Sequence, residues 1–439
     1  MKAYDAWGVP HCASRDDVTA WDAVVEAVAS HHATTASQLD ALLEKCPDFA
    51  AAVALRGLAL LFKGRRDLYH AIDIQLREGL RLKRDGALSS FDGALFNVLQ
   101  AWRNDDYPAT KLALEALVEL TPTHLLAVKL QHGFLFLAGD RKGMVRAIDR
   151  VLPEWDRDSR GYGFVLGCAS FALGEVENYE RADRLGRAAV EHQPDDAWGI
   201  HAVSHVYEMR DDNAGGIEWL EQHRSGFESC NNFRGHVFWH LALFELGQSR
   251  LDRVFELCDG EVRRAWCGDY RDMSNVASLL WRLEVDGIDV GDRWEELGEI
   301  AARHHTDHGS AFADAHYVLA LARCGREDEL EEFFASVGGL PPPSPGQAAV
   351  VRGIGTELCS AVAALGSGRY REAIEYFERA APDLASVGGS NAQRDLFEQL
   401  HIHACLAAGD RDRSEALLQR RLAQRPNNPW ATQRWSALA

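Results

Sequence analysis

Apolar residues recur every three or four positions along almost the whole chain, and short turns rich in Gly, Asp, Asn and Pro separate the apolar runs. This spacing is typical of amphipathic helices, in which residues three and four apart share one face. The alternation at every second position that strands show is almost absent. The pattern predicts an all-α protein without a sheet, with a lead-in over 1–35 that carries one helix at about 18–30, and a helical array over 36–439.

The turns align at a period close to 34 residues. The segment 368–380 reads Gly-x-Tyr-x-x-Ala-x-x-x-Phe-x-x-Ala around Tyr370, and Tyr179 and Tyr107 begin the same frame, each with a Pro fifteen residues later. This is the spacing of the second helix of a tetratricopeptide repeat, in which small residues allow close helix approach. The chain is therefore predicted to be a tetratricopeptide-like α-solenoid, a right-handed superhelix of antiparallel helix pairs.

Three segments break this rhythm. The spacing is irregular over about 259–303, and the segment 338–347 contains too many prolines for a helix, which predicts a linker or surface loop. The third is the Gly-Gly-Ser-Asn sequence at 388–391, which precedes a helix predicted over about 392–408.

The 18 histidines are unevenly distributed, and four of them form two pairs in equivalent positions. His201 and His205 are four residues apart, as are His236 and His240, so each pair lies on one face of a helix. The second pair follows the first by 35 residues, and His132 precedes His201 by 69, close to two repeats. We expect these five side chains to converge on one interior cavity at the concave face of the array.

Imidazoles in such a cavity are suited to binding a divalent transition metal or to moving protons. His201, His205, His236 and His240 are the candidate metal ligands and catalytic residues. Asp314 and His316 are candidates to complete a catalytic site, and His316 is expected in the same cavity. Five further side chains are candidates for binding a ligand: His132, Glu208, His308, Asn391 and Arg394.

Two of these candidates have a specific reason. Glu208 follows His205 by three residues and so shares its helix face. Asn391 and Arg394 lie where a Gly-rich turn enters a helix, and the exposed N–H groups of a helix N-terminus bind anions.

Each feature also has a structural interpretation. His-x-x-x-His without an intervening glutamate is a weak metal motif, and histidines at this spacing are often simply hydrogen-bonded. Ser390 or Asn391 can be an ordinary N-cap beside a structural Arg394. The sequence contains no Walker loop, dinucleotide fingerprint or nucleophile elbow, and Cys258 and Cys267 have no histidine in phase with them.

The amino-acid composition limits which partners and which cellular compartment we expect for the protein. The net charge of −19 opposes binding to nucleic acid, whose affinity for proteins comes from Lys and Arg. Nine cysteines occur singly, as expected of reduced, buried thiols. Without a signal-like N-terminus or an uninterrupted run of 18 apolar residues, we expect a cytoplasmic protein that does not enter a membrane.

Several longer strings resemble the tetratricopeptide repeat protein 38 family, most clearly over about 130–404. They are Asp-Ala-Trp-Gly-Ile-His-Ala-Val-Ser-His-Val-Tyr-Glu-Met at 196–209, His-Val-Phe-Trp-His-Leu-Ala-Leu at 236–243, and Val-Gly-Asp-Arg-Trp at 290–294. Asp307-His308, Phe-Ala-Asp-Ala-His at 312–316 and Gly-Gly-Ser-Asn-Ala-Gln-Arg-Asp-Leu-Phe at 388–397 are similar too. The resemblance implies a tetratricopeptide-like helical protein and implies no particular activity. The first hundred residues match it less well.

Two functions from different classes remain open. In the first, a His/Asp-rich pocket binds a small molecule, as in an enzyme for metal-assisted or general-base hydrolysis. In the second, the chain is a non-enzymatic interaction scaffold that binds a peptide in its groove. Histidine and aromatic residues at groove positions favour the first function, and the usual role of such repeats favours the second. A homo-oligomer is compatible with both.

Overall fold

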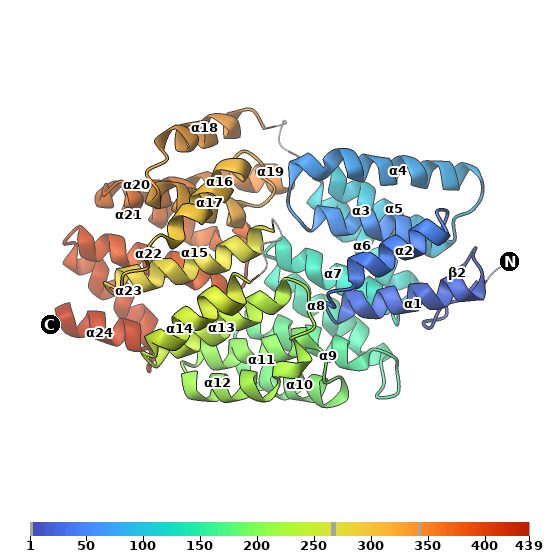
Figure 1. Ribbon diagram of the computed structural model, residues 1–439, viewed down its shortest axis with the longest axis horizontal. Helices are drawn as coiled ribbons and strands as arrows, with labels where there is room; N and C mark the ends of the chain where they lie inside the picture. The colour runs from blue at the N-terminus through green and yellow to red at the C-terminus, as the bar shows by residue number, and fades with distance from the viewer. Residues whose placement is uncertain (1–2, 265–268, 341–343, 439) are drawn as a thin grey trace. The chain divides into compact units, whose positions relative to one another are not determined.

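The computed structural model describes residues 3–264, 269–340 and 344–438, and nearly all regular structure in them is helical (Figure 1). The chain divides into two compact units. Unit 1 contains Met1–Val203, His223–Phe233 and Pro342–Ala348. Unit 2 contains Ser204–Gln222, Arg234–Pro341 and Ala349–Ala439. One uninterrupted helix, α11 (Ala197–Met209), includes residues of both units.

Unit 1 carries the first ten helices and three short 3₁₀ turns. The α-helices are α1 (Arg15–Ala29), α2 (Thr35–Lys45), α3 (Ala50–Leu61), α4 (Tyr69–Arg84), α5 (Ser90–Arg103), α6 (Tyr107–Leu120), α7 (Leu125–Leu137), α8 (Arg141–Val151), α9 (Tyr162–Glu175) and α10 (Tyr179–His192). The 3₁₀ turns are η1 (Arg66–Leu68), η2 (Leu152–Glu154) and η3 (Arg224–Gly226).

Unit 2 carries the remaining helices. They are α12 (Asn213–Gln222), α13 (Phe233–Gly247, whose first residue belongs to unit 1), α14 (Leu251–Leu257), α15 (Tyr270–Val285), α16 (Arg293–His304), α17 (Ala311–Arg323), α18 (Glu327–Gly338), α19 (Gln347–Val350, whose first two residues belong to unit 1), α20 (Thr356–Gly366), α21 (Tyr370–Ala380), α22 (Asn391–Ala407), α23 (Arg411–Gln424) and α24 (Pro429–Leu438). Shorter π and 3₁₀ segments are η4 (Cys258–Val262), η5 (Val351–Gly355) and η6 (Ala381–Val387).

The predicted repeat frame is confirmed. Tyr107, Tyr179 and Tyr370 are the first residues of α6, α10 and α21. Consecutive helices pack against each other in both units, α3 on α4, α5 on α6, α9 on α10 and α20 on α21. Within the described residues the fold is therefore an all-α, tetratricopeptide-like array, and the right-handed superhelix stays a prediction.

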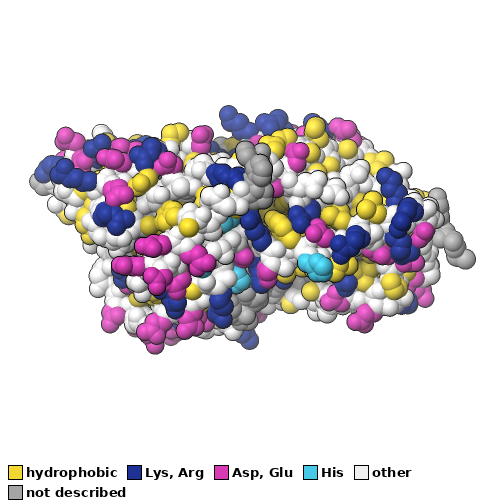
Figure 2. Space-filling model, turned by 90° about the horizontal axis from the view of Figure 1, so that it is seen from above, with side chains coloured by type: hydrophobic (Ala, Val, Ile, Leu, Met, Phe, Trp, Pro, Cys, Tyr) yellow, Lys and Arg dark blue, Asp and Glu magenta, His cyan; other side chains and the backbone are white. Residues whose placement is uncertain are grey.

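The two helices of a pair differ in how deeply they are buried. In α9 every residue from Gly163 to Glu175 is buried, whereas α10 buries only Ala182, Gly186, Ala189 and Val190, which follow the 3.6-residue period. The pair in unit 2 formed by α20 and α21 shows the same contrast. First helices thus lie between neighbours on all sides, while second helices expose a polar face. On the face shown in Figure 2, acidic and basic side chains are interspersed.

The all-α prediction is confirmed, with one short pair of strands near the start of the described residues. Strand β1 (Ala3–Tyr4) pairs antiparallel with β2 (Pro10–His11), joined by a turn in which Gly8 has a φ of 82°. Glycine adopts this left-handed conformation without strain. Two residues per strand are too few for an alternating pattern to show in the sequence.

The segments predicted as irregular contain both irregular and regular structure. The segment 259–303 begins in the π-helical η4 and includes Cys267, which lies outside the described residues, but α15 and α16 in it are regular helices. In the Pro-rich segment, residues 341–343 lie outside the described ones. Just after them, Ser344 Oγ and the backbone N–H of Gln347 donate to the carboxylate of Asp105, at 2.7 and 2.6 Å. The helix predicted after 388–391 is confirmed as α22, whose capping box is made by Ser390 and Gln393.

One stretch of the described chain, Gln347–Gly366, passes a test of length and apolar composition for crossing a membrane. It comprises α19, η5 and α20, and 56% of it is buried inside the protein. Core helices of globular proteins pass the same test, so the stretch is weak evidence for a membrane span.

We predict opposite effects for two Gly-to-Ala substitutions in unit 1. A Cβ on Gly79 in α4 would lie 2.4–2.7 Å from ring atoms of Phe96, whereas a Cβ on Gly93 in α5 meets nothing within 4 Å. Gly79→Ala should lower the free energy of unfolding by about 1–3 kcal/mol through overpacking. Gly93→Ala should raise it by up to about 1 kcal/mol, because alanine favours the helix. Urea unfolding followed by circular dichroism measures both, and equal effects would contradict the close packing of α4 on α5.

Candidate metal centre

The two histidine pairs lie on α11 and α13, which are first helices of their repeats. Because such helices are buried on all sides, the imidazoles are buried as well: His201 is 2% exposed, His205 5%, His236 8% and His240 0%. The repeat spacing read from the sequence therefore placed these side chains in the interior.

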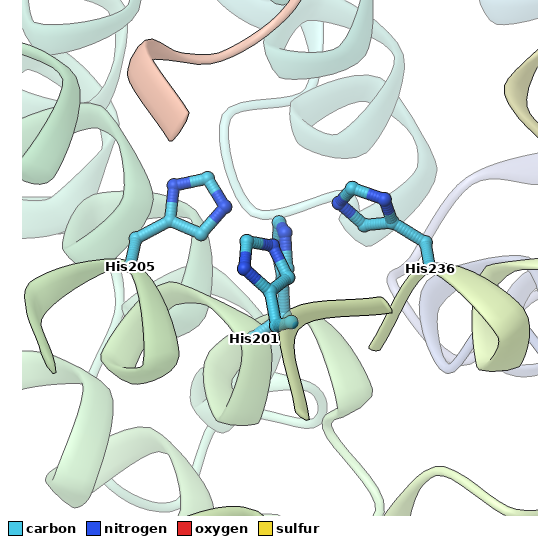
Figure 3. Close-up of side chains that lie close together, drawn as sticks. His201, His205 and His236 are labelled. Carbon is cyan, nitrogen blue, oxygen red and sulfur yellow. The ribbon is translucent and has the colours of Figure 1, made fainter. Parts of the chain in front are cut away.

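The structure brings both pairs together. The three that belong to unit 2, His205, His236 and His240, each offer one ring nitrogen, and these nitrogens lie within 4.8 Å of one another. The ring centroid of His240 is 4.7 Å from that of His205 and 4.9 Å from that of His236. His201 stands one turn before His205 on the continuous α11, and its ring nitrogen falls within the same 4.8 Å limit. Figure 3 shows the rings of His201, His205 and His236 turned toward one another.

Two of the imidazoles are oriented by hydrogen bonds at Nδ1. Nδ1 of His240 lies 2.6 Å from Oε2 of Glu208, and Nδ1 of His236 lies 2.9 Å from Oδ1 of Asn275. Both partners are acceptors, so each Nδ1 carries the proton and donates. In a neutral imidazole this places the lone pair on Nε2, the nitrogen that would bind a metal.

Electrostatics favours the form of histidine that binds metals. Burial holds the pKa values of His236 and His240 well below their ordinary value, and the neighbouring imidazoles lower them further. Both rings are therefore neutral near pH 7. Burial also raises the pKa of Glu208, while His205 and Arg425 act in the opposite direction.

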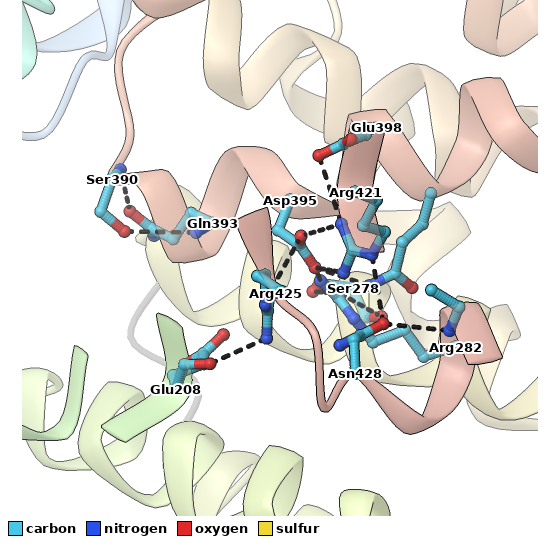
Figure 4. Close-up of polar contacts among 12 residues, drawn as sticks. Glu208, Ser278, Arg282, Ser390, Gln393, Asp395, Glu398, Arg421, Arg425 and Asn428 are labelled. Carbon is cyan, nitrogen blue, oxygen red and sulfur yellow. Dashed lines mark hydrogen bonds and ion pairs between the residues drawn. The ribbon is translucent and has the colours of Figure 1, made fainter. Parts of the chain in front are cut away.

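A buried network of charges lies next to Glu208, all of it in unit 2 (Figure 4). Its centre is Asp395 on α22. Arg421 donates to both carboxylate oxygens of Asp395, at 2.5 and 3.1 Å, Arg425 donates at 3.2 Å, and Arg282 lies at 3.5 Å. Although burial alone raises it, Arg421 and Arg425 hold the pKa of Asp395 well below its ordinary range.

This network also holds the end of α11. Nη2 of Arg425 donates to the backbone carbonyl of Glu208 at 2.8 Å and to Oδ1 of Asp211 at 2.5 Å, and its Nε donates to Oδ2 of Asp211 at 3.3 Å. Asn428 donates to the same carboxylate at 2.7 Å. The helix that carries His205 and Glu208 is therefore fixed at its C-terminal end by buried ion pairs.

His132 has other neighbours. In unit 1, Trp198 Nε1–H donates to His132 Nε2 at 3.2 Å, and Phe171 packs edge-on against the imidazole. Burial lowers the pKa of His132 to about 3, so it is neutral. These contacts satisfy a buried histidine by packing and one hydrogen bond.

His316 is likewise surrounded by aromatic rings. Its Nδ1–H donates to the backbone carbonyl of Phe312 at 2.8 Å, and Phe397 lies 5.4 Å away between ring centroids. Burial lowers its pKa to about 4. Neither His132 nor His316 is among the clustered nitrogens, so the expected convergence is found for the two pairs.

Asp314, His308 and Ser336 are connected by a series of hydrogen bonds. His308 Nδ1 lies 3.1 Å from Oδ2 of Asp314, and its Nε2 lies 2.8 Å from Oγ of Ser336. The residue types match a nucleophilic triad, but Ser336 lies in the last turn of α18. The N–H groups of Gly339 and Leu340 that follow it donate to helix carbonyls and are not available as an oxyanion hole. These hydrogen bonds connect α17, the loop before it and α18, and a catalytic role for Asp314 stays a prediction.

Arg394 uses its guanidinium within its own turn. It donates to the carbonyl oxygens of Gly388 and Gly389 and, at 2.8 Å, to Oδ1 of Asn391. These bonds fix the glycine turn at the start of α22. They support the structural interpretation of Asn391 and Arg394 more than the anion site.

Sequence reasoning missed several residues of this region. They are Asn275 and Arg282 on α15, Asp395 on α22, Arg421 on α23 and Arg425 just after α23, all outside the helices that carry the histidine pairs. Asp395 follows Arg394 directly, but charged residues on helices are usually solvated, so composition gave no signal of burial. In unit 1, Oδ2 of Asp5 lies 2.9 Å from Nε2 of His11 and 3.1 Å from Nε2 of His124. No sequence motif predicted these contacts.

These helix pairs and their register define the class of the protein, a tetratricopeptide-like helical repeat protein. No family model matches the sequence. Among solved structures, the chain is similar to one in the crystal structure of the APC/C hetero-tetramer Cut9-Hcn1, with a TM-score of 0.49 and 12% identity over 95% of this chain and 69% of that one. It is also similar to a chain in the structure of Naa15/Naa10 bound to HypK-THB, with a TM-score of 0.24 and 11% identity over 96% of this chain and 66% of that one. The chain thus spans about two thirds of each, and similarities this low carry no function over.

We predict that His132 makes stability depend on pH. Its pKa is about 3 in the folded protein and about 6.5 in the unfolded chain, so below pH 6.5 the unfolded state binds the extra proton. Stability is then fully present above pH 6.5 and falls as the pH drops, by up to about 1.4 kcal/mol per pH unit for this group. Urea unfolding between pH 7.5 and 5 should show a shallower loss for His132→Gln than for the wild type. The exposed His70→Gln should keep the wild-type slope, and a His132→Gln slope equal to it would contradict the prediction.

Proposed function

We propose that this protein is a non-catalytic helical-repeat scaffold in which one divalent transition metal joins α11 to α13. The observation that supports it most is the convergence of buried imidazole nitrogens within 4.8 Å, with two rings oriented by Glu208 and Asn275. Metal-bound histidines almost always donate their second ring N–H to a carboxylate or carbonyl oxygen. That arrangement exists here for both His240 and His236.

The distances are compatible with ligation. Two nitrogens bound tetrahedrally at about 2.0–2.1 Å from one zinc lie about 3.4 Å apart. The nitrogens here lie within 4.8 Å, so side-chain shifts of about 1 Å bring them onto one ion. Neutral imidazoles of this kind suit Zn²⁺ and its neighbours in the first transition row.

The geometry supports a structural role more than hydrolysis. Structural zinc sites are closed by four protein ligands, whereas catalytic sites keep one position for water. With His201 the cluster supplies four imidazoles, each no more than 8% exposed. A metal held by all four has no position left for a substrate or an attacking water.

A protein or peptide partner belongs to the proposal. Helical-repeat arrays present extended surfaces that bind other chains. If the metal is held by protein ligands alone, this surface is the part of the protein that binds a partner. The net charge of −19 favours a basic partner. We further propose membership of the tetratricopeptide repeat protein 38 family, which rests on the strings at 196–209, 236–243 and 388–397.

We predict that the purified full-length protein binds one Zn²⁺ or Co²⁺ per chain. At free metal 100-fold above Kd, binding should stabilise the fold by about 2.7 kcal/mol and raise Tm by roughly 5–10 °C over the chelator-treated protein. Elemental analysis and thermal melting measure both. The visible spectrum of the Co²⁺ form reports tetrahedral ligation.

The matched variants are His240→Gln and His316→Gln. Both remove a buried imidazole from unit 2, but only His240 belongs to the cluster. His240→Gln should abolish the metal-dependent rise in Tm, while His316→Gln should melt lower and keep it. A wild-type protein with the same Tm in metal and in chelator would contradict the proposal.

A further inference from the structure

We infer that Arg425 is a positioning residue of this centre, acting on the metal ligands through the last turn of α11. The inference rests on the proposed function, because it concerns the same site. Arg425 lies on the chain just after α23 and touches none of the four histidines through its hydrogen bonds, which go to Asp211, Asp395 and the carbonyl of Glu208.

The last turn of α11 is where orientation matters. His205 and Glu208 are three residues apart on one face of α11, and Asp211 lies in the turn just after the helix, where its φ is 56°. The backbone carbonyl of Glu208 accepts from the N–H of Asp211 at 3.0 Å and accepts a second hydrogen bond from Arg425 at 2.8 Å. It also forms a two-point contact with Asp211. The backbone that carries the Glu208 side chain is thereby held between two buried contacts.

Glu208 in turn determines which nitrogen of His240 is the ligand. Its carboxylate, 2.6 Å from Nδ1, keeps the proton there and the lone pair on Nε2. A shift of the last turn would lengthen this bond and release the ring to rotate or change tautomer. Removing Arg425 should therefore weaken metal binding without removing a ligand.

Arg421 provides a matched control. It lies four residues earlier, is buried, and binds the same Asp395 with two hydrogen bonds. Its other hydrogen bonds go to Glu398 and Asn428, and among the described residues none goes to α11. Losing Arg421 leaves Asp395 short of a partner, as losing Arg425 does, but the clamp on α11 remains.

The experiment measures Zn²⁺ affinity of the full-length protein by competition with a chromophoric chelator, and the tautomer of His240 by ¹⁵N chemical shifts of the metal-free protein. Arg425→Gln should weaken Zn²⁺ binding by about 10–100-fold and remove the single Nδ1–H signature of His240. Arg421→Gln should lower Tm but keep the wild-type affinity within about twofold.

A second variant covers the case in which Arg425→Gln does not fold. Asp211→Asn is nearly isosteric, leaves Arg425 bound to Asp395, and should weaken Zn²⁺ binding in the same direction. The double variant should bind Zn²⁺ no more weakly than Arg425→Gln alone, because both changes break the same contact between Arg425 and Asp211. Wild-type affinity in Asp211→Asn and Arg425→Gln, or equal losses in Arg421→Gln and Arg425→Gln, would overturn the inference. A wild-type protein that binds no Zn²⁺ would instead overturn the proposed function.

Discussion

The carboxylate of Glu208 has to be compensated on both sides, because it is buried on the inner face of α11. On one side it accepts a hydrogen bond from His240, and on the other it is attracted by Arg425 and Arg282. An uncompensated buried charge costs several kcal/mol, so neither side can be removed without consequence. The histidine cluster and the arginine network around Asp395 are thus two halves of one arrangement.

A cluster of buried histidines differs from a single buried histidine in what surrounds each ring. His132 and His316 show that one buried imidazole is accommodated by aromatic packing and one hydrogen bond. In the cluster, four imidazoles each offer one ring nitrogen within 4.8 Å of the others, and Nδ1 of two of them is held by Glu208 and Asn275. A divalent cation bound there would be held by several imidazole nitrogens at once. Packing alone offers no comparable benefit, which is why we favour a metal over a purely structural cluster.

The sequence predicted the fold and half of the site, for a physical reason. Helical periodicity and the tyrosine frame are local, so α6, α10 and α21 begin where the pattern placed them. Because His205 and His240 are 35 residues apart, close to one repeat, the same regularity predicted that they lie close together. The sequence did not predict that Asn275, Asp395 and Arg425 belong to this region, because their contacts depend on how distant helices pack. No local pattern distinguishes a buried Arg–Asp pair from a solvated one. His316 was expected to complete the site, but its ring donates to the backbone carbonyl of Phe312 and lies in a separate environment.

The central claim is that buried imidazoles hold a metal. X-ray absorption spectroscopy of the zinc-loaded, full-length protein tests it most directly, because it reports the ligands themselves. The account predicts three or four nitrogen neighbours at about 2.0–2.1 Å with the outer-shell scattering of imidazole rings. A first shell made mainly of water or carboxylate oxygen, without imidazole scattering, would contradict it.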